Sequence, residues 1–156
     1  MAAAKGWKNR IVGHGQEAPD QLLANPRNWR IHPKEQQTAL DGELSEIGWV
    51  AQVLVNQRTG FVIDGHLRVA LAISRGEKKV PVLYVDLSEA EEGRVLATLD
   101  PLAGMAVMDK AKMAELLAEV GVSNDLLASL AAEAEMGASA EVGEAIARKP
   151  ITCPEC

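Results

Sequence analysis

The sequence has few of the residues that mark several protein classes. Only two of its 156 residues are cysteine and only five are aromatic. No apolar run reaches the roughly 20 residues that a membrane-spanning helix needs, and the N-terminus lacks the apolar stretch of a secretory signal peptide. We therefore expect a cytoplasmic protein with no membrane partner and an aliphatic core. A platform of aromatic side chains for stacking nucleobases is not expected.

Positive charge is scarce overall and unevenly distributed. The chain has a net charge of −6, but residues 1–80 carry 11 Lys and Arg against 8 Asp and Glu, whereas residues 81–156 carry 5 against 14. This distribution excludes a uniformly basic nucleic-acid-binding protein. It allows an anion site in the first half, and the acidic second half should repel a phosphate backbone.

Both cysteines lie in the last four residues, as Cys153-Pro-Glu-Cys156. This C-x-x-C spacing supplies two of the four ligands that a structural zinc site requires. No histidine and no second cysteine pair follows. Zn²⁺ binding by Cys153 and Cys156 therefore needs ligands from a second chain or from further sequence, and without them we expect a tail that binds nothing.

Turn residues and hydrophobic periodicity divide the chain into four parts. We expect an N-terminal arm over 1–19, a folded domain over 20–105, a helical extension over 106–136 and a tail over 137–156. The extension holds two helical patterns, over 109–120 and 124–136, which we expect to pack as an antiparallel pair on the domain.

The domain itself mixes helical and strand patterns. Helices are predicted over 34–47, 66–74 and 88–99, a β-hairpin over 53–63 and a further strand over 80–87. The last helix should end before Asp100-Pro101, because proline interrupts helices. The prediction is an α+β fold with a small mixed sheet of three to five strands flanked by helices.

One junction, Phe61-Val-Ile-Asp-Gly-His-Leu-Arg68, has the pattern of an anion site. A strand enters a glycine turn and continues as a helix, whose first N–H groups and dipole favour negative charge. Gly65 permits close approach to a ligand, His66 can donate, accept or bind a metal ion, and Arg68 can bind a phosphate with two hydrogen bonds. Asp64 either holds a metal ion that accompanies the phosphates or caps the helix.

A basic cluster precedes this junction in the sequence. Arg27 and Arg30 lie close to Lys34 and form either a solvated face or a phosphate-binding face. His32 is a weaker candidate for ligand contact, with simple surface exposure as the alternative. Trp29 either covers a base or anchors the core.

The order of these motifs resembles that of the ParB/sulfiredoxin superfamily. Residues 65–88 contain a glycine box, a helix that ends in glycine, a Val-Pro-Val strand and an acidic-Leu-Ser step, and Asn25-Pro26-Arg27 is similar to the family's Asn-Pro start. The resemblance covers roughly residues 20–105. It implies a ParB/sulfiredoxin-like fold and a nucleotide site at the box. Asp100 matches a metal-binding asparagine of the family, which implies Mg²⁺ there and at Asp64.

The chain departs from ParB proteins at several positions of that site. His66 stands where ParB proteins have glutamate, and Leu67 and Ala103 stand where they have arginine. Sulfiredoxin has cysteine at the position of His66, so its thiol chemistry is not expected. The departures imply weak triphosphate binding and slow or absent CTP turnover.

The Asp-Gly-His-x-Arg box is similar to that of phage-type ParB-like nuclease domains, a subgroup associated with DNA methyltransferases. This resemblance implies a nucleotide- or phosphate-binding domain in the DNA metabolism of a phage or prophage, in a bacterial host cell. A candidate reaction is Mg²⁺-dependent phosphoryl transfer or hydrolysis, with His66 and Asp64 as catalytic residues. Two alternatives stay open, namely a non-enzymatic adaptor that binds DNA or a methyltransferase, and a DNA nuclease. A homo-oligomer is compatible with each of them.

Overall fold

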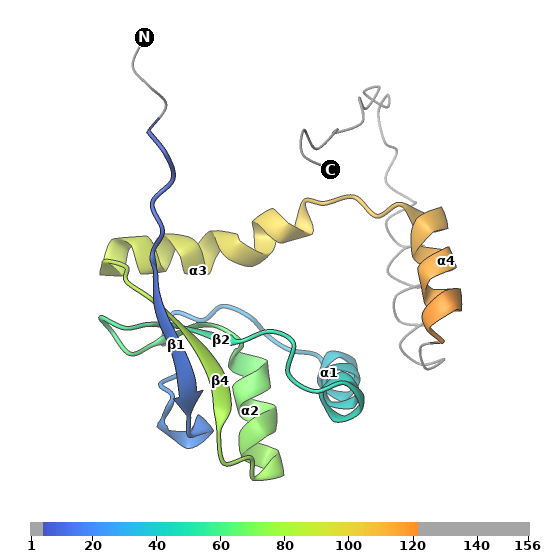
Figure 1. Ribbon diagram of the computed structural model, residues 1–156, viewed down its shortest axis with the longest axis horizontal. Coiled ribbons are helices and arrows are strands. Elements are labelled where there is room, and N and C mark those ends of the chain that lie inside the picture. Colours follow the sequence, from blue (N-terminus) through green and yellow to red (C-terminus); the bar gives the residue numbers. More distant parts are fainter. Residues whose placement is uncertain (1–4, 122–156) are drawn as a thin grey trace. The chain divides into compact units, whose positions relative to one another are not determined.

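The computed structural model describes residues 5–121 of the chain. The chain divides after Ala106 into two compact units, which are described separately. The first unit contains, in order, β1 (Ile11–Glu17), the short 3₁₀ helix η1 (Pro19–Gln21), α1 (Lys34–Glu46), β2 (Val53–Asn56), β3 (Val62–Asp64), α2 (His66–Arg75), β4 (Val80–Val85) and α3 (Glu89–Gly104), as Figure 1 shows.

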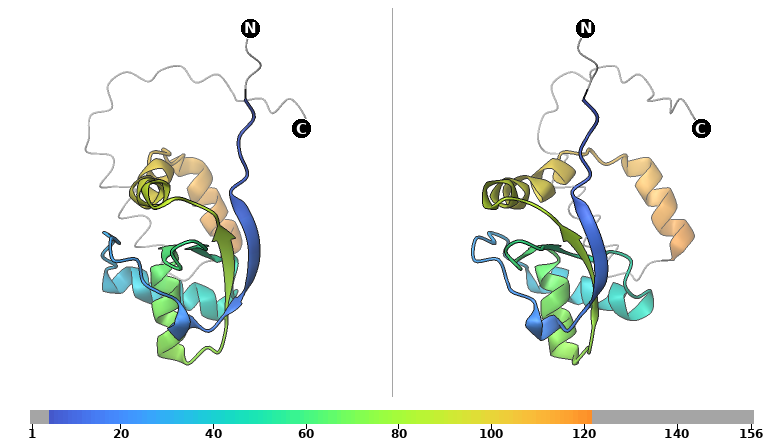
Figure 2. Two further views of the ribbon diagram at one scale, coloured as in Figure 1. Left: turned by 90° about the vertical axis from the view of Figure 1, so that its left-hand side faces the viewer. Right: turned by 60° about the vertical axis from the view of Figure 1, so that its left-hand side comes forward.

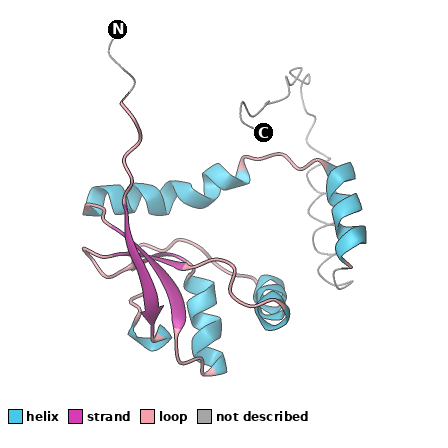
Figure 3. Cartoon of the chain, in the orientation of Figure 1, coloured by secondary structure: helices cyan, strands magenta, loops and turns pink. Residues whose placement is uncertain are grey.

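The four strands form one mixed sheet with the order β1-β4-β2-β3. β2 and β4 are parallel and are connected through α2, whereas β1 pairs antiparallel with β4 and β3 antiparallel with β2 (Figure 3). α2 and α3 cover opposite faces of the sheet at β2 and β3 (Figure 2), because Val53 and Val55 pack in the cluster with α2 whereas Leu54 packs in the cluster with α3. The predicted α+β class and the β2–β3 hairpin are confirmed.

The core is aliphatic, as the shortage of aromatic residues predicts. Valines from β2, β3 and β4 pack against α2 in one buried cluster, and a second cluster joins the sheet to α3 through Ile63, Val85, Leu87 and Leu96. Full burial of each such side chain contributes about 1.5–3 kcal/mol. The two clusters fix α2 and the first half of α3 against the sheet end where Asp64 lies.

Strand β1 corrects the expectation that residues 1–19 form an arm separate from the domain. Ile11–Glu17 pairs with β4, with one irregularity between Ile11 and Gly13. Its sequence contains two glycines and few apolar residues, so side-chain pattern gives little strand signal. The strand is held at the sheet edge by backbone hydrogen bonds and by an ion pair from Arg10 to Glu91 (2.6 Å).

Helix α3 also differs from the prediction, because it continues through Pro101 to Gly104 instead of ending at Leu99. Its start agrees with the prediction, since Ser88 and Glu91 form the expected capping box. Pro101 lies near the helix end, where the missing N–H removes one hydrogen bond, and the ribbon bends there (Figure 1). The continuation places Asp100 on a helix rather than in a loop.

The second unit contains α4 (Lys110–Val120), which agrees with the predicted helix over 109–120. The Asp109 side chain accepts a hydrogen bond from the Lys112 backbone N–H (3.1 Å) at its start, and Gly121, with φ of 64°, follows its end. The predicted helix over 124–136 and the Cys153/Cys156 pair lie outside the described residues. None of the described helices combines the length and the hydropathy required to cross a membrane.

Candidate functional site

A cavity of about 330 Å³ opens where β3 passes into α2. Its wall comes from the loop before α1, from α1, from the β3–α2 junction and from the second half of α3. The residues that line it are Arg30, His32, Gln36, Leu40, Asp64, Gly65, His66, Leu67, Arg68 and Asp100. The cavity thus collects the predicted site residues of the 64–68 junction together with Arg30, His32 and Asp100.

Gly65 makes the sharp turn between β3 and α2. Its φ of 97° lies in the left-handed region, and a Cβ atom there would approach Val53 Cα to 3.3 Å and Arg68 Nη2 to 3.2 Å. Gly65 is itself the N-cap of α2, and no side chain caps this helix. The alternative that Asp64 caps the helix is therefore wrong, and the first N–H groups of α2 have no capping side chain as a partner.

The Arg68 guanidinium lies over this turn. Its Nη2 donates hydrogen bonds to Asp64 Oδ2 (3.0 Å) and to the Gln52 carbonyl oxygen (3.3 Å). The Arg68 Nε atom is buried and has no partner. Asp64 therefore orients Arg68 while leaving one of its donors free.

Arg30 enters the cavity from the opposite wall and is almost fully buried, with 8% of its side chain exposed. Nη1 donates to the Ile63 carbonyl oxygen (3.2 Å) and Nε to the Asp100 carboxylate, whereas Nη2 has no partner. Trp29 supports this arrangement, because its ring centroid lies 5.3 Å from the Arg30 guanidinium carbon and its indole N–H donates to the Leu96 carbonyl oxygen (2.9 Å). Trp29 thus anchors the loop to α3.

Two histidine rings complete the lining. His66 Nε2 accepts a hydrogen bond from the Asn25 backbone N–H (3.2 Å), which leaves Nδ1 buried and without a partner. Burial and then the nearby Arg30 charge lower the pKa of His66 below its ordinary value of 6.5, so the ring is neutral at neutral pH. His32 Nδ1 contacts Gln36 Oε1 (2.9 Å), and its Nε2 has no partner.

Four buried nitrogen atoms without a hydrogen-bond partner therefore belong to residues that line the cavity: Arg30 Nη2, His32 Nε2, His66 Nδ1 and Arg68 Nε. In the described part of the chain, no other buried side-chain nitrogen or oxygen lacks a partner. An unpartnered buried donor costs about 1–3 kcal/mol. Arg30 Nη2, Arg68 Nε and His66 Nδ1 are donors, whereas His32 Nε2 is an acceptor because Nδ1 of that ring donates to Gln36 Oε1. Three such donors on residues that line one cavity are the arrangement expected for a ligand that supplies acceptor oxygens.

The fold has a known counterpart among solved structures. The C-terminally truncated chromosome-partitioning protein ParB from Caulobacter crescentus, complexed with CTP-γ-S, aligns with 68% of this chain at a TM-score of 0.54 and 20% identity. The described fold is therefore similar to that of this ParB protein. The chain spans 63% of that protein's length.

Two structures of a pNOB8-like ParB N-domain align with TM-scores of 0.49. They are 17% and 16% identical to this chain, cover 59% and 61% of it, and are covered over 37% and 35% of their own length. Neither the protein-family models nor the curated proteins contain a match to the sequence.

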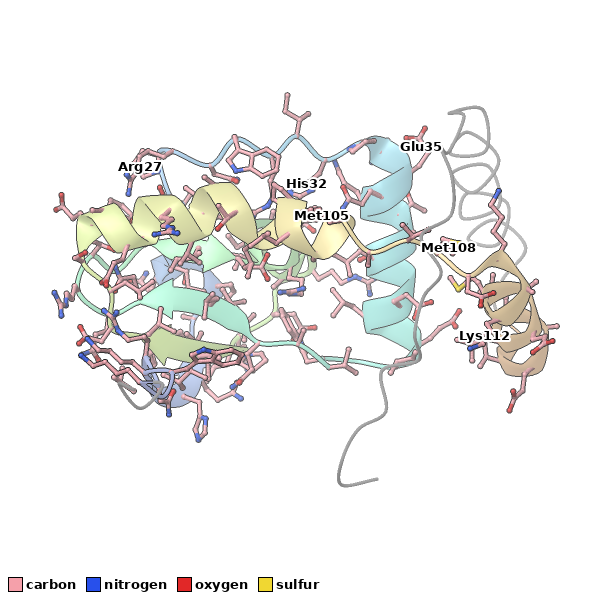
Figure 4. The ribbon with its side chains drawn as sticks, turned by 90° about the horizontal axis from the view of Figure 1, so that it is seen from above. Arg27, His32, Glu35, Met105, Met108 and Lys112 are labelled. Carbon is pink, nitrogen blue, oxygen red and sulfur yellow. The ribbon has the colours of Figure 1, made fainter. Side chains whose placement is uncertain are left out.

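Arg27 is the one residue of the predicted phosphate-binding set that does not line the cavity of this ParB-like fold. Its Nη2 donates to Glu92 Oε1 (3.3 Å) and to the Glu89 carbonyl oxygen (3.3 Å). Figure 4 shows Arg27 beside the first half of α3, away from His32. Arg27 therefore links the loop to α3, and its contact with a phosphate stays a prediction.

The carboxylates of the cavity do not fit a preformed metal site. Asp64 accepts from Arg68 and Asp100 from Arg30, so both carboxylates are already engaged by guanidinium groups. Among residues 5–121, no three His, Cys, Asp or Glu side chains are grouped so that they could hold a metal ion. Mg²⁺ at Asp64 and Asp100 stays a prediction.

Proposed function

We propose that this chain binds a phosphate group of a nucleotide in the cavity between β3, α2, α3 and the loop before α1. The three buried donor nitrogens without partners carry the proposal. Arg30 Nη2, His66 Nδ1 and Arg68 Nε are donors, and a phosphate offers acceptor oxygens to all three. The start of α2 adds uncapped N–H groups on the same wall.

A nucleotide is favoured over other phosphate compounds by the fold. A solved ParB protein of the same fold is complexed with a CTP analogue. The resemblance of the 65–88 region to the ParB box supports the same ligand class. Catalysis by His66 and Asp64, a role in phage DNA metabolism, binding to DNA or a methyltransferase, nuclease activity and homo-oligomer formation stay predictions of the resemblance.

Calorimetry with the full chain tests the proposal. Inorganic phosphate, pyrophosphate, CTP and ATP are titrated at low salt, with and without MgCl₂, because screening weakens ion pairs. We expect binding that Arg68→Gln weakens about tenfold to a hundredfold, the loss of one charge-assisted hydrogen bond. Arg75→Gln is the matched control, since Arg75 lies on the same helix but pairs with Asp41 (2.6 Å) outside this cavity. Equal affinities for wild type and Arg68→Gln, or no binding of any of the four ligands, would contradict the proposal.

A further inference from the structure

A buried carboxylate on α3 is connected to the cavity through one asparagine. Glu92 has 1% of its side chain exposed. Its Oε1 accepts from Asn25 Nδ2 (3.1 Å) and Arg27 Nη2 (3.3 Å), and its Oε2 accepts from Asn56 Nδ2 (2.7 Å) and the Thr59 hydroxyl. Burial raises the pKa of Glu92, but these four hydrogen bonds outweigh burial and lower the pKa below its ordinary value. The side chain is therefore a fixed, charged acceptor.

Asn25 is held from two sides at this carboxylate. Its side-chain amide donates to Glu92, and its Oδ1 accepts from the Arg27 backbone N–H (3.0 Å), which closes a tight turn. Only 4% of Asn25 is exposed. With both ends of its side chain engaged, the residue's backbone has a fixed direction, and its N–H points at His66 Nε2.

This contact determines which nitrogen of His66 carries the proton. A backbone N–H can only donate, so Nε2 must offer its lone pair and the neutral ring must carry hydrogen on Nδ1. A free histidine in water favours hydrogen on Nε2. Nδ1 is a buried nitrogen without a partner, on a ring that lines the cavity. The contact with Asn25 therefore makes Nδ1 the donor atom of the neutral His66 ring.

We propose that Asn25 and Glu92 are positioning residues, which hold His66 as the Nδ1–H tautomer so that the ring donates to a bound phosphate oxygen. The part that concerns phosphate rests on the proposed function, whereas the tautomer is a property of the free protein. In this state His66 is not a general base, because Nε2 is occupied by Asn25 and Nδ1 is protonated. Its role is to orient and stabilise the anion.

The first test measures the tautomer without any ligand. In heteronuclear NMR spectra of the full chain with labelled histidine nitrogens, the His66 signals are assigned by their loss in His66→Asn. We expect wild-type His66 to be the Nδ1–H tautomer at slightly alkaline pH. Hydrogen on Nε2 in the wild type would overturn the proposal.

The second test shifts the tautomer equilibrium of His66 by substitutions at residues whose side chains do not contact its ring. Glu92→Gln and Asn25→Ser should shift His66 toward the Nε2–H form. Glu91→Gln is the control, because Glu91 is the neighbouring acid on α3 and pairs with Arg10 instead. If Glu92→Gln does not fold, Thr59→Val removes one hydrogen bond to Glu92 from the opposite side. An unchanged His66 tautomer in all folded variants would overturn the positioning role of Asn25 and Glu92.

The third test connects the tautomer to phosphate. The Asn amide nitrogen can take the place of Nδ1, so His66→Asn should keep more phosphate affinity than His66→Ala, by about threefold to tenfold for one neutral hydrogen bond. Equal affinity of the two variants would overturn the donor role. The wild type could bind no phosphate and still show the expected tautomer, with its shift in Asn25→Ser. The proposed function would then fail, whereas the positioning of His66 by Asn25 and Glu92 would be supported.

Discussion

Arg30 and Asp100 form an ion pair in the cavity wall, and this pair leaves Arg30 Nη2 as a buried donor without a partner. The Asp100 side chain is half exposed, whereas that of Arg30 is buried. The aspartate therefore neutralises a cation that a phosphate would otherwise meet. Together with the Asp64–Arg68 pair, it gives the cavity equal numbers of acidic and basic side chains.

Removal of the Asp100 charge should strengthen phosphate binding. Asp100→Asn keeps the size of the side chain but removes one negative charge near the anion. We expect inorganic phosphate to bind about three- to tenfold more tightly without Mg²⁺, a screened Coulomb effect at a half-exposed site. Calorimetry on wild type and variant measures it. Weaker binding that appears only with MgCl₂ present would instead support the predicted Mg²⁺ role of Asp100.

Gly65→Ala should damage both stability and phosphate binding. The substitution combines the left-handed backbone with a 3.3 Å approach to Val53 Cα, so we expect a loss of about 2–4 kcal/mol in the free energy of unfolding. Gly76→Ala is a matched control at the other end of α2, where φ is 73° but no atom lies within 4 Å. It should lose only about 1 kcal/mol and bind phosphate normally. Urea unfolding measures both variants, and equal losses would show that the close approach has no effect.

The strand–glycine–helix junction could be predicted from the sequence because its signals are local. Gly65 is required by one φ angle, and the apolar spacing of residues 66–74 marks the buried face of α2. The edge strand β1 could not be predicted, because backbone pairing with β4 stabilises it rather than its own side chains. The end of α3 could not be predicted from Pro101, because a proline near a helix end removes only one backbone hydrogen bond and does not have to terminate the helix.

The chain of hydrogen bonds from Glu92 through Asn25 to His66 could not be predicted from sequence patterns either. Asn25 shows only a turn signal, and Glu92 looks like one more acid at the start of an acidic helix. The two are 67 positions apart, and only the tertiary fold brings them into contact. The contact of Arg27 with Glu92 spans 65 positions, and nothing local in the sequence indicates it either.

The Arg10–Glu91 pair should make the attachment of β1 to α3 sensitive to acid. The hydrogen bond from Arg10, followed by that from the Ser88 backbone N–H, lowers the pKa of Glu91 from 4.5 to about 2. A lowered carboxyl pKa adds stability above the unfolded-state value, and this contribution is lost as the pH falls through the folded-state value. Thermal unfolding should therefore show Glu91→Gln below wild type near neutral pH, with the gap closing between about pH 4.5 and pH 2.

Arg10→Gln gives the control for this pair. Without its partner, Glu91 should regain most of its ordinary pKa, so Arg10→Gln should show a smaller change in stability over the same acid range. A gap between Glu91→Gln and wild type that stays constant down to pH 2 would contradict the assignment of the acid sensitivity to Glu91.

Triphosphates should bind only weakly and should show little preference over inorganic phosphate. Leu67 is 8% exposed and apolar, and it lines the cavity at a position where ParB proteins are expected to carry arginine. Each missing charge-assisted contact removes about 1.5–3 kcal/mol, so the absence of arginines at Leu67 and Ala103 corresponds to a loss of about two to four powers of ten in affinity. Without Mg²⁺ we expect CTP to bind less than about tenfold more tightly than phosphate, and CTP turnover to be slow or absent. Calorimetry and a phosphate-release assay measure the two quantities. Tight, CTP-selective binding with steady hydrolysis would contradict this prediction. It would show that residues outside the described cavity contact the base and the outer phosphates. It would also show that affinity is not limited by the neutral charge balance of the cavity, which is set by Arg30, Arg68, Asp64 and Asp100.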